Sequence, residues 1–526
     1  MPSSHALTGR TSFLAFVLGS AAVTAGVVLH LPMFLMARHH GFVMAGMPMD
    51  RGMLAGMVLI VGGVLLAAFG LLPRKRAHAG DGSAEIVVAA PEDAPLSAAH
   101  WRLMLVLVIA LIIDVMKPAS LGFTIPGMIK EYGVPRETVS LVPFVALIGT
   151  VVGSILWGMI ADTYGRKASI LLSAVMFVGT SICGAMPSLA WNIAMCFMMG
   201  AAAGGMLPVT YALLAEMMPS RHRGWSLVLV GGLGSVGGYF AASGLSALLQ
   251  PVFGWRILWL LNLPTGLTLI LLGSFIPESA KFLLLQGRRA EAQKVMARFG
   301  SRVRKVAAIT APPVLDLHSP LAGRAMVAKL AALSVAGITW GLINFGLLLW
   351  LPADLVAKGN SMALSSKLLA ESALIAFPTV FAVAYLYSRW SSKWSVVATL
   401  GITILGLLLL VRLELAGIGS PVVPVALLIV GSNGLIAVLI PFTAESFPLH
   451  IRGRSTGWVA ACSKLGGVLA QLLSIAAIVP TMAVTALGLI VPTALGLLMI
   501  AIFGRETRGR DLRALDRPMT PAELHL

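Results

Sequence analysis

The sequence predicts an all-α polytopic membrane protein with fourteen membrane-spanning helices, and three observations support this prediction. Of the 526 residues, 58% are apolar and only 11% are charged, whereas a soluble domain carries roughly 25% charged residues. The apolar residues gather into runs long enough to cross about 30 Å of hydrocarbon. Short basic clusters occur in every second connection between these runs, as orientation signals in membrane proteins do.

Two of the apolar runs precede a Gly- and Ala-rich stretch, and twelve follow it. This stretch, residues 76–100, is expected to be a flexible cytoplasmic linker. The first run is expected to be a retained span, because it is longer than the apolar part of a signal peptide. The expected spans are 12–36, 52–72, 102–126, 139–161, 168–187, 189–215, 225–249, 256–275, 326–352, 366–388, 394–412, 421–445, 456–478 and 480–503.

The basic clusters determine the expected orientation. They lie at 74–76, 165–167, 221–223, 287–289, 302–305 and 452–454, and the positive-inside rule places them in the cytoplasm. Both termini are then cytoplasmic, in an inner (plasma) membrane protein. The net charge of +17 could also indicate a nucleic-acid partner, but no DNA-binding motif accompanies it. We therefore expect the lipid bilayer, and no nucleic acid, as the partner of these charges.

A long-range repeat divides most of the chain into two halves. Segments 216–224 and 445–453 both read E-x-x-P-x-x-x-R-G, at an offset of 445 − 216 = 229. Gly237-Gly238 and Gly466-Gly467 keep this offset, and two further motif pairs lie within three residues of it. Parallel repeats are typical of transporters with two bundles. The predicted parts are a two-helix hairpin (1–75), a linker (76–100), a six-helix bundle (101–278), a central cytoplasmic loop (279–325), a second six-helix bundle (326–507) and a cytoplasmic tail (508–526).

The loop motifs resemble those of a known family. Segment 158–167, G-M-I-A-D-T-Y-G-R-K, resembles the G-x-x-x-D-x-x-G-R-K loop of the major facilitator superfamily. The repeated E-x-x-P-x-x-x-R-G and P-E-S-A-K-F at 277–282 resemble its sugar-porter and organic-ion branches, which include aromatic-acid:proton symporters. The resemblance covers about residues 101–510 and implies the major facilitator fold, with alternating access to a central site. The first 100 residues have no counterpart in the ordinary twelve-span pattern, so the hairpin is an addition.

The same motifs are expected to form a conformational latch of charges. Asp162 ends a span, where it can accept hydrogen bonds from arginine or cap a helix, and Gly165 allows a tight turn. Contacts made in one state only would bias the conformational equilibrium. The alternative is that these residues only anchor loops to the anionic inner leaflet. The second copy has Ser388 in place of the aspartate. The expected latch residues are Gly158, Asp162, Gly165, Arg166, Lys167, Glu216, Arg223, Glu445 and Arg452.

Three charged residues fall near mid-membrane, where a charge costs roughly 2.5–3.5 kcal/mol on insertion scales. Asp114 is expected to carry a coupled proton, because desolvation favours a carboxyl group that can load and release one, and similar porters of sugars and aromatic acids often have an acid at this place. The alternative is a structural ion pair with Lys117 on the same helix face. Lys464 has no acid within four residues, so it is expected to bind an anionic group of the substrate. Its counterpart in the repeat is Ser235 (464 − 235 = 229).

Aromatic and amide side chains are expected to line the substrate site around these charges, since small-molecule sites combine apolar walls with a few polar groups. Packing roles are the alternative for each residue, and Trp350 is expected at the outer membrane interface. The family's usual arginine in the fourth span is replaced by Cys196, and Ser235 replaces the proline typical of drug antiporters, which favours uptake. The expected substrate-binding residues are Lys117, Lys464, Tyr211, Trp340, Asn344, Phe345 and Asn433.

Methionine and histidine are concentrated between the first two spans. Residues 30–53 hold six Met and three His. Thioether and imidazole groups select soft metals such as Cu(I), but methionine also fills membrane gaps as a flexible apolar residue. The spacing matches no ligand motif, so no metal site is predicted and a copper-sensing loop remains an alternative. The three cysteines are scattered singly, and no nucleotide-binding or catalytic motif is present. We expect no cofactor and no enzymatic activity.

The sequence therefore predicts a secondary transporter, expected to be a monomer, that couples a proton to uptake of a small organic anion such as a carboxylate. The first alternative is a proton-driven efflux antiporter of drugs or metabolites. The second is a membrane sensor that binds a ligand without moving it, related to metal through the Met- and His-rich loop.

Overall fold

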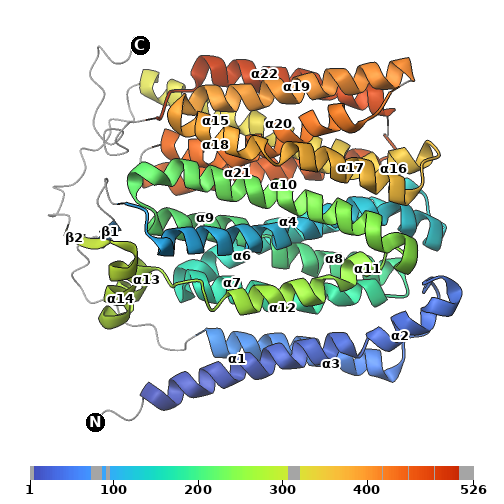
Figure 1. Ribbon diagram of the computed structural model, residues 1–526, viewed down its shortest axis with the longest axis horizontal. Helices are drawn as coiled ribbons and strands as arrows, with labels where there is room; N and C mark the ends of the chain where they lie inside the picture. Colours follow the sequence, from blue (N-terminus) through green and yellow to red (C-terminus); the bar gives the residue numbers. More distant parts are fainter. Residues whose placement is uncertain are drawn as a thin grey trace.

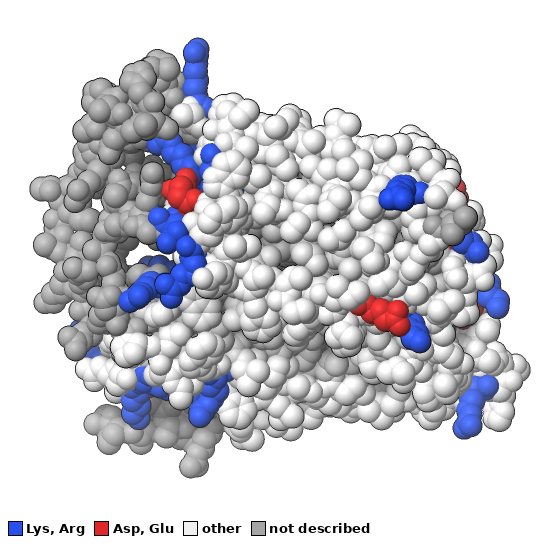
Figure 2. Space-filling view, turned by 45° about the horizontal axis from the view of Figure 1, so that its top comes forward, with Lys and Arg blue, Asp and Glu red and all other residues white. Residues whose placement is uncertain are grey.

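The computed structural model describes residues 5–72, 86–89, 95–305, 320–417, 419–447, 449–478 and 480–508. Its helices run side by side along the long axis of the molecule, with the C-terminal bundle, the N-terminal bundle and the hairpin in successive tiers (Figure 1). Figure 2 shows a broad belt without charged residues between two ends where Lys, Arg, Asp and Glu gather. Such a belt is the surface that a bilayer requires, and the chain is a multi-pass membrane protein.

The predicted all-α class is confirmed, and helices account for the expected spans. Within the described ranges, thirteen helices are long and apolar enough to cross a membrane. A shorter apolar helix, Ile257–Leu272, coincides with the expected span 256–275 and completes the set of fourteen.

The hairpin consists of α1 (His5–Val28), the short α2 (Leu31–Met36) and α3 (Arg51–Leu71). Glycines at seven-residue spacing let α1 and α3 approach closely, as small residues do in membranes. An ideal Cβ on Gly56 would lie 2.6 Å from the carbonyl oxygen of Gly26, and one on Gly63 would lie 2.7 Å from that of Gly19. Asp50 caps α3 by accepting a hydrogen bond from the Met53 amide at 2.7 Å. The hairpin is thus a tightly packed pair of helices.

The N-terminal bundle packs against this hairpin and is built on the long α4. Its helices are α4 (Ala98–Tyr132), α5 (Arg136–Val139), α6 (Leu141–Tyr164), α7 (Arg166–Gly179), α8 (Leu189–Ala203), α9 (Met206–Met217), α10 (Ser220–Phe253), α11 (Ile257–Leu260) and α12 (Asn262–Leu272). The hairpin contacts α7, where Ile60 lies 2.9 Å from an ideal Cβ on Gly179. Glycines of α10 lie against α4: Gly234 faces Leu111 and Gly238 faces Val115.

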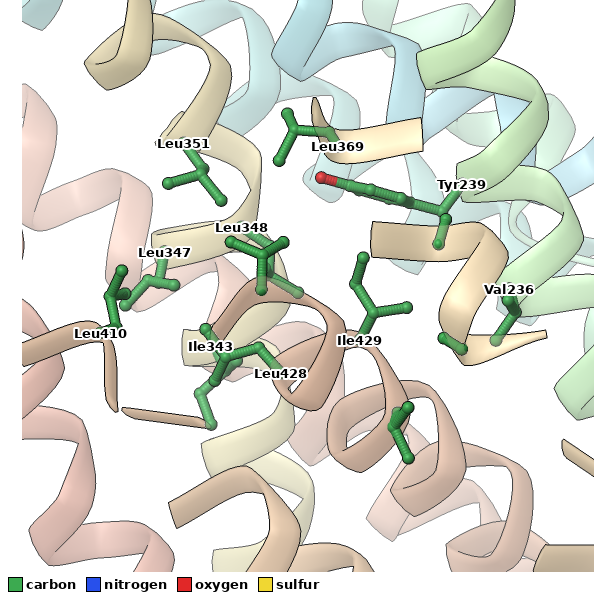
Figure 3. Close-up of a cluster of buried hydrophobic side chains, with 14 of the residues drawn as sticks. Val236, Tyr239, Ile343, Leu347, Leu348, Leu351, Leu369, Leu410, Leu428 and Ile429 are labelled. Atoms are coloured by element: carbon green, nitrogen blue, oxygen red, sulfur yellow. The ribbon is translucent and has the colours of Figure 1, made fainter. Parts of the chain in front are cut away.

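The C-terminal bundle repeats this arrangement with its own helices. They are α15 (Pro320–Gly341), a π-helical segment Leu342–Leu348, α16 (Leu349–Ala357), α17 (Met362–Ala376), α18 (Thr379–Arg389), α19 (Ser392–Ala416), α20 (Val422–Ser446), α21 (Leu449–Ile475) and α22 (Met482–Phe503). In Figure 3 the ring of Tyr239, from α10, reaches toward Leu369 of α17. One buried apolar cluster therefore joins the two bundles.

Two short strands add a feature that the sequence did not suggest. In the expected linker, β1 (Ile86–Ala89) pairs antiparallel with β2 (Arg302–Lys305) of the central loop. The central loop also contains α13 (Ala280–Leu285) and α14 (Arg289–Phe299). All of these lie at one end of the molecule (Figure 1), which we call the linker end; the opposite end is the far end.

The two bundles touch at both ends of their interface. At the far end the hydroxyls of Ser140 and Ser474 are 2.7 Å apart, and the Arg136 guanidinium lies 4.0 Å from the ring centroid of Trp350. At the linker end an ideal Cβ on Gly224 would lie 3.3 Å from Glu445.

Candidate substrate site and latch

Lys464 lies near the middle of α21, with its ammonium group between two aromatic rings. Its Nζ is 5.6 Å from the ring centroid of Trp340 and 5.3 Å from that of Phe345. The two rings meet edge to face with centroids 5.6 Å apart. These distances allow cation–π attraction. The C-terminal bundle thus supplies a cation within an aromatic wall, from three residues that the sequence had singled out.

The N-terminal bundle supplies an acid opposite this cation. Asp114, on α4, is only 6% exposed, and its Oδ1 has no hydrogen-bond partner among the described residues. Its carboxylate interacts electrostatically with Lys464, and more weakly with Lys117. Among the described residues, Lys464 forms neither a hydrogen bond nor an ion pair. Opposite charges from the two bundles therefore face each other without direct pairing.

A third polar atom near these charges also lacks a partner. The indole Nε1 of Trp340 is buried and donates to no described group. A buried polar atom left unsatisfied costs about 1–3 kcal/mol. A group with acceptor oxygens could accept hydrogen bonds from both Trp340 and Lys464.

The backbone beside this site is irregular. Residues Leu342–Leu348 form a π-helical segment, and π-bulges are frequent at functional sites. Gln471, fully buried on α21, donates its side-chain amide to the carbonyl oxygen of Phe345. It also accepts a hydrogen bond from the Trp350 indole at 3.4 Å. Sequence reasoning missed Gln471, although an amide in the middle of a span was a usable signal.

Lys117 does not share this site, which corrects the expectation that it binds substrate. Its ammonium donates to the Phe177 carbonyl oxygen at 3.2 Å and to the Thr180 hydroxyl, and lies 3.7 Å from the Phe177 ring centroid. These partners belong to the interior of the N-terminal bundle. The expected alternative, a direct ion pair between Asp114 and Lys117, is also absent from the described contacts, because the ammonium is turned toward α7.

The other expected lining residues are dispersed. Tyr211 directs its hydroxyl against Gly231 of α10, inside the N-terminal bundle. Asn433 is buried on α20, and Asn344 lies in the π-helical segment beside Phe345. Trp350, at the far end, is only 3% exposed and is covered by Arg136, so its ring is packed inside the protein and does not face lipid.

The first latch motif forms a charge network at the linker end. Arg166 lies 3.3 Å from Asp162 and 3.1 Å from Glu216, and it donates to the Ala161 carbonyl oxygen at 2.9 Å. Gly165 has φ 106°, a conformation that favours glycine, and an ideal Cβ there would lie 2.3 Å from Glu278. Gly158, by contrast, has open space around its missing side chain, so sterics do not explain this glycine.

Two glutamates outside the expected latch set cap corresponding helices in the two halves. Glu278 accepts a hydrogen bond from the Arg166 amide at 2.8 Å, at the start of α7. Glu506 accepts one from the Ser392 amide at 2.9 Å, at the start of α19. Burial raises the pKa of Glu278 despite its amide partners. Burial also acts to raise the pKa of Glu506, but hydrogen bonds from Ser391 and Ser392 outweigh it and lower the pKa to about 2.

The second latch motif uses hydroxyl groups where the first uses an arginine. Glu445 accepts hydrogen bonds from Tyr387 and Thr507, both at 2.7 Å. Arg223 of the N-terminal bundle interacts with it electrostatically, so this motif reaches across the bundle interface. Lys167 lies beside Glu278, and the side chain of Arg452 lies outside what the structure describes.

The chain resembles known proteins over most of its length. A family model, Major Facilitator Superfamily, matches residues 103–471. The niacin transporter NiaP of Acinetobacter baylyi is 25% identical over 450 residues, which cover 82% of this chain and 99% of that transporter. The 4-hydroxybenzoate transporter PcaK of Pseudomonas aeruginosa is 27% identical over 418 residues, or 71% of this chain and 85% of that one.

Solved structures agree in fold. The proton:xylose symporter XylE matches with a TM-score of 0.63 and 16% identity, over 80% of this chain and 99% of that one. The inward open conformation of XylE from E. coli gives a TM-score of 0.60 at 15% identity, over 79% of this chain and 99% of that one. With two facilitator bundles and relatives that are transporters, this chain belongs to the Major Facilitator Superfamily and is a membrane transporter, not an enzyme.

Proposed function

We propose that the protein takes up a small aromatic monocarboxylate together with one proton. The observation that supports this is the placement of Lys464 between Trp340 and Phe345, opposite the buried carboxyl group of Asp114. A carboxylate would pair with the ammonium group, and an aromatic ring would lie against the aromatic wall. Niacin and 4-hydroxybenzoate, the substrates named for two relatives, each combine one ring with one carboxylate.

The charges explain why a proton would accompany the anion. When Asp114 is ionised, its charge offsets that of Lys464, and a substrate carboxylate would meet a carboxylate across the site. Protonation of Asp114 leaves Lys464 as the facing cation. The anion and the proton therefore favour each other's binding, which is the reciprocity that defines coupled sites. We propose cytoplasmic termini as well, because the basic loops lie at the linker end.

Uptake by proteoliposomes tests this function. With an inward proton gradient, labelled nicotinate or 4-hydroxybenzoate should accumulate above its external concentration, while nicotinamide, which has the ring without the charge, should not. Collapsing the gradient with a protonophore should abolish accumulation. If the proton gradient instead expels these compounds, the protein is an efflux antiporter; if purified protein binds them but vesicles never transport them, it is a sensor.

The latch geometry gives a further prediction about rate. Glu278→Gln should slow transport about tenfold, because charge-assisted hydrogen bonds contribute about 1.5–3 kcal/mol and 1.4 kcal/mol corresponds to a factor of ten. Asp162→Asn should change the rate less than about fivefold, since the Asp162 side chain is 78% exposed and such surface pairs contribute ~0–1 kcal/mol. Initial uptake rates, normalised to expressed protein, provide the measurement.

Glu506→Gln is the corresponding variant in the second half. If the caps bias a conformational equilibrium, both glutamine variants should remain folded and should shift the accessibility of a cysteine placed at the far end. Equal rates in wild type and Glu278→Gln would leave these residues as topology anchors only.

A further inference from the structure

A buried histidine in the hairpin has a ring nitrogen whose lone pair accepts no hydrogen bond from the described residues. His30 lies at the break between α1 and α2 and is 0% exposed. Its Nδ1 is 2.8 Å from the carbonyl oxygen of Gly26. A carbonyl can only accept, so Nδ1 carries the proton and Nε2 has the lone pair. Nε2 is buried and has no hydrogen-bond partner within the described ranges.

Two buried methionines lie three residues from positions in or against this imidazole, one on α2 and one on α3. Met33 follows His30 by three residues and is 2% exposed, and Met53 on α3 is 0% exposed. The His30 ring lies against Gly56, where an ideal Cβ would be 2.7 Å from its Cε1. Met53 precedes Gly56 by three residues, so it shares that helix face. Met33, Met44 and Met53 belong to one buried cluster.

We propose that this cluster binds a soft monovalent metal ion, Cu(I) or Ag(I), through Nε2 of His30 and thioether sulfurs of Met33 and Met53. Thioether and imidazole ligands select such ions. A metal-binding histidine commonly donates its other ring nitrogen to a backbone carbonyl, as His30 does to Gly26. Methionine packing alone would explain why sulfur atoms are buried here. It would leave the Nε2 lone pair of His30 without a partner, at a cost of about 1–3 kcal/mol.

The ligand set argues against harder ions. The described residues contain no group of three or more His, Cys, Asp or Glu side chains placed to hold a metal, and zinc and calcium depend on such groups. Met36 is 53% exposed, and His39 and His40 on the same turn are also exposed. These three side chains lie at the surface and are not part of the proposed ligand set.

The site is connected to the transporter bundle. The loop after α2 docks on Glu131 of α4, which accepts hydrogen bonds from the Met44 and Ala45 amides at 2.7 and 3.0 Å. Glu131 is in turn paired at 2.7 Å with the fully buried Arg256. A bound ion would therefore stabilise the docked loop, and with it the far end of the N-terminal bundle. This site shares no residue with the proposed substrate site.

Silver binding by the purified full-length protein tests this inference. The protein would be incubated with Ag(I), desalted, and its metal content measured. Wild type should retain about one Ag(I) per chain and melt at a higher temperature, since a ligand of the native state stabilises it by mass action. His30→Gln should lose the retained ion, whereas His40→Gln, an exposed neighbour, should keep it. Zn(II) should not be retained.

A conservative double variant controls for misfolding. Replacing Met33 and Met53 together with leucine keeps volume and apolarity, which cores tolerate well, but removes both sulfurs. This double variant should fold and yet lose the ion, and X-ray absorption of the Cu(I) form of wild type should show nitrogen and sulfur ligands. Undiminished Ag(I) in His30→Gln or in the double leucine variant would overturn the proposal, as would loss of the ion in His40→Gln alone.

Discussion

Replacing Lys464 with glutamine should weaken binding of an aromatic carboxylate about 10- to 100-fold, while leaving a neutral amide of the same shape unaffected. Lys464 is the cation of the proposed site, and its acidic counterpart, Asp114, faces it from the other bundle without a direct ion pair among the described residues. Hydrogen bonds to charged groups contribute about 1.5–3 kcal/mol, and each 1.4 kcal/mol is a factor of ten in affinity. Glutamine is one bond shorter than lysine but keeps hydrogen bonding and removes the charge. Calorimetric titration with nicotinate and nicotinamide would measure both affinities.

Lys117→Gln is the matched control, because it removes a second mid-membrane lysine at a comparable depth. Its ammonium is bonded to Phe177 and Thr180 inside the N-terminal bundle. Its loss should therefore lower the melting temperature but leave the preference for carboxylate over amide unchanged. If the two variants lose carboxylate affinity equally, or if Lys464→Gln weakens both ligands alike, Lys464 is a packing residue and the anion assignment is wrong.

The contrast between these two lysines shows what the sequence could predict. Hydropathy and the 229-residue repeat were sufficient for the spans and the two bundles, because both depend on regular patterns along the chain. The cost of a buried charge identified Asp114, Lys117 and Lys464 as unusual. Helix periodicity, however, gives only the face on which a side chain starts. A lysine side chain is long, and the position of its ammonium group depends on neighbours from other parts of the fold. For Lys117 that neighbour is Thr180.

Partners distant in sequence account for the other omissions. Glu278 caps α7 from 112 residues away, and Gln471 reaches the π-helical carbonyl of Phe345 from 126 residues away. Neither pairing leaves a local pattern. The hairpin was correctly predicted as an addition, but its docking on Glu131 depends on backbone amides of Met44 and Ala45, which any residue could supply.

Asp114→Asn should abolish accumulation of the carboxylate while sparing exchange across the membrane. One proton moving with one monocarboxylate carries no net charge, so the pH difference alone drives uptake. One pH unit corresponds to 1.36 kcal/mol, or about tenfold accumulation. Asparagine resembles the protonated carboxyl group in size and charge, so Lys464 stays available to the anion. The variant should bind substrate, but it has no proton to load or release.

Two measurements on the same proteoliposomes separate coupling from binding. Under an inward pH difference of about one unit, wild type should concentrate labelled substrate about tenfold, and Asp114→Asn should only equilibrate it. With saturating unlabelled substrate inside and no gradient, both should exchange label at similar rates. The affinity of wild type should fall as pH rises and Asp114 ionises, whereas that of the variant should not change with pH. A variant that still concentrates substrate would place the proton carrier elsewhere and leave Asp114 as the electrostatic counterpart of Lys464 across the bundle interface.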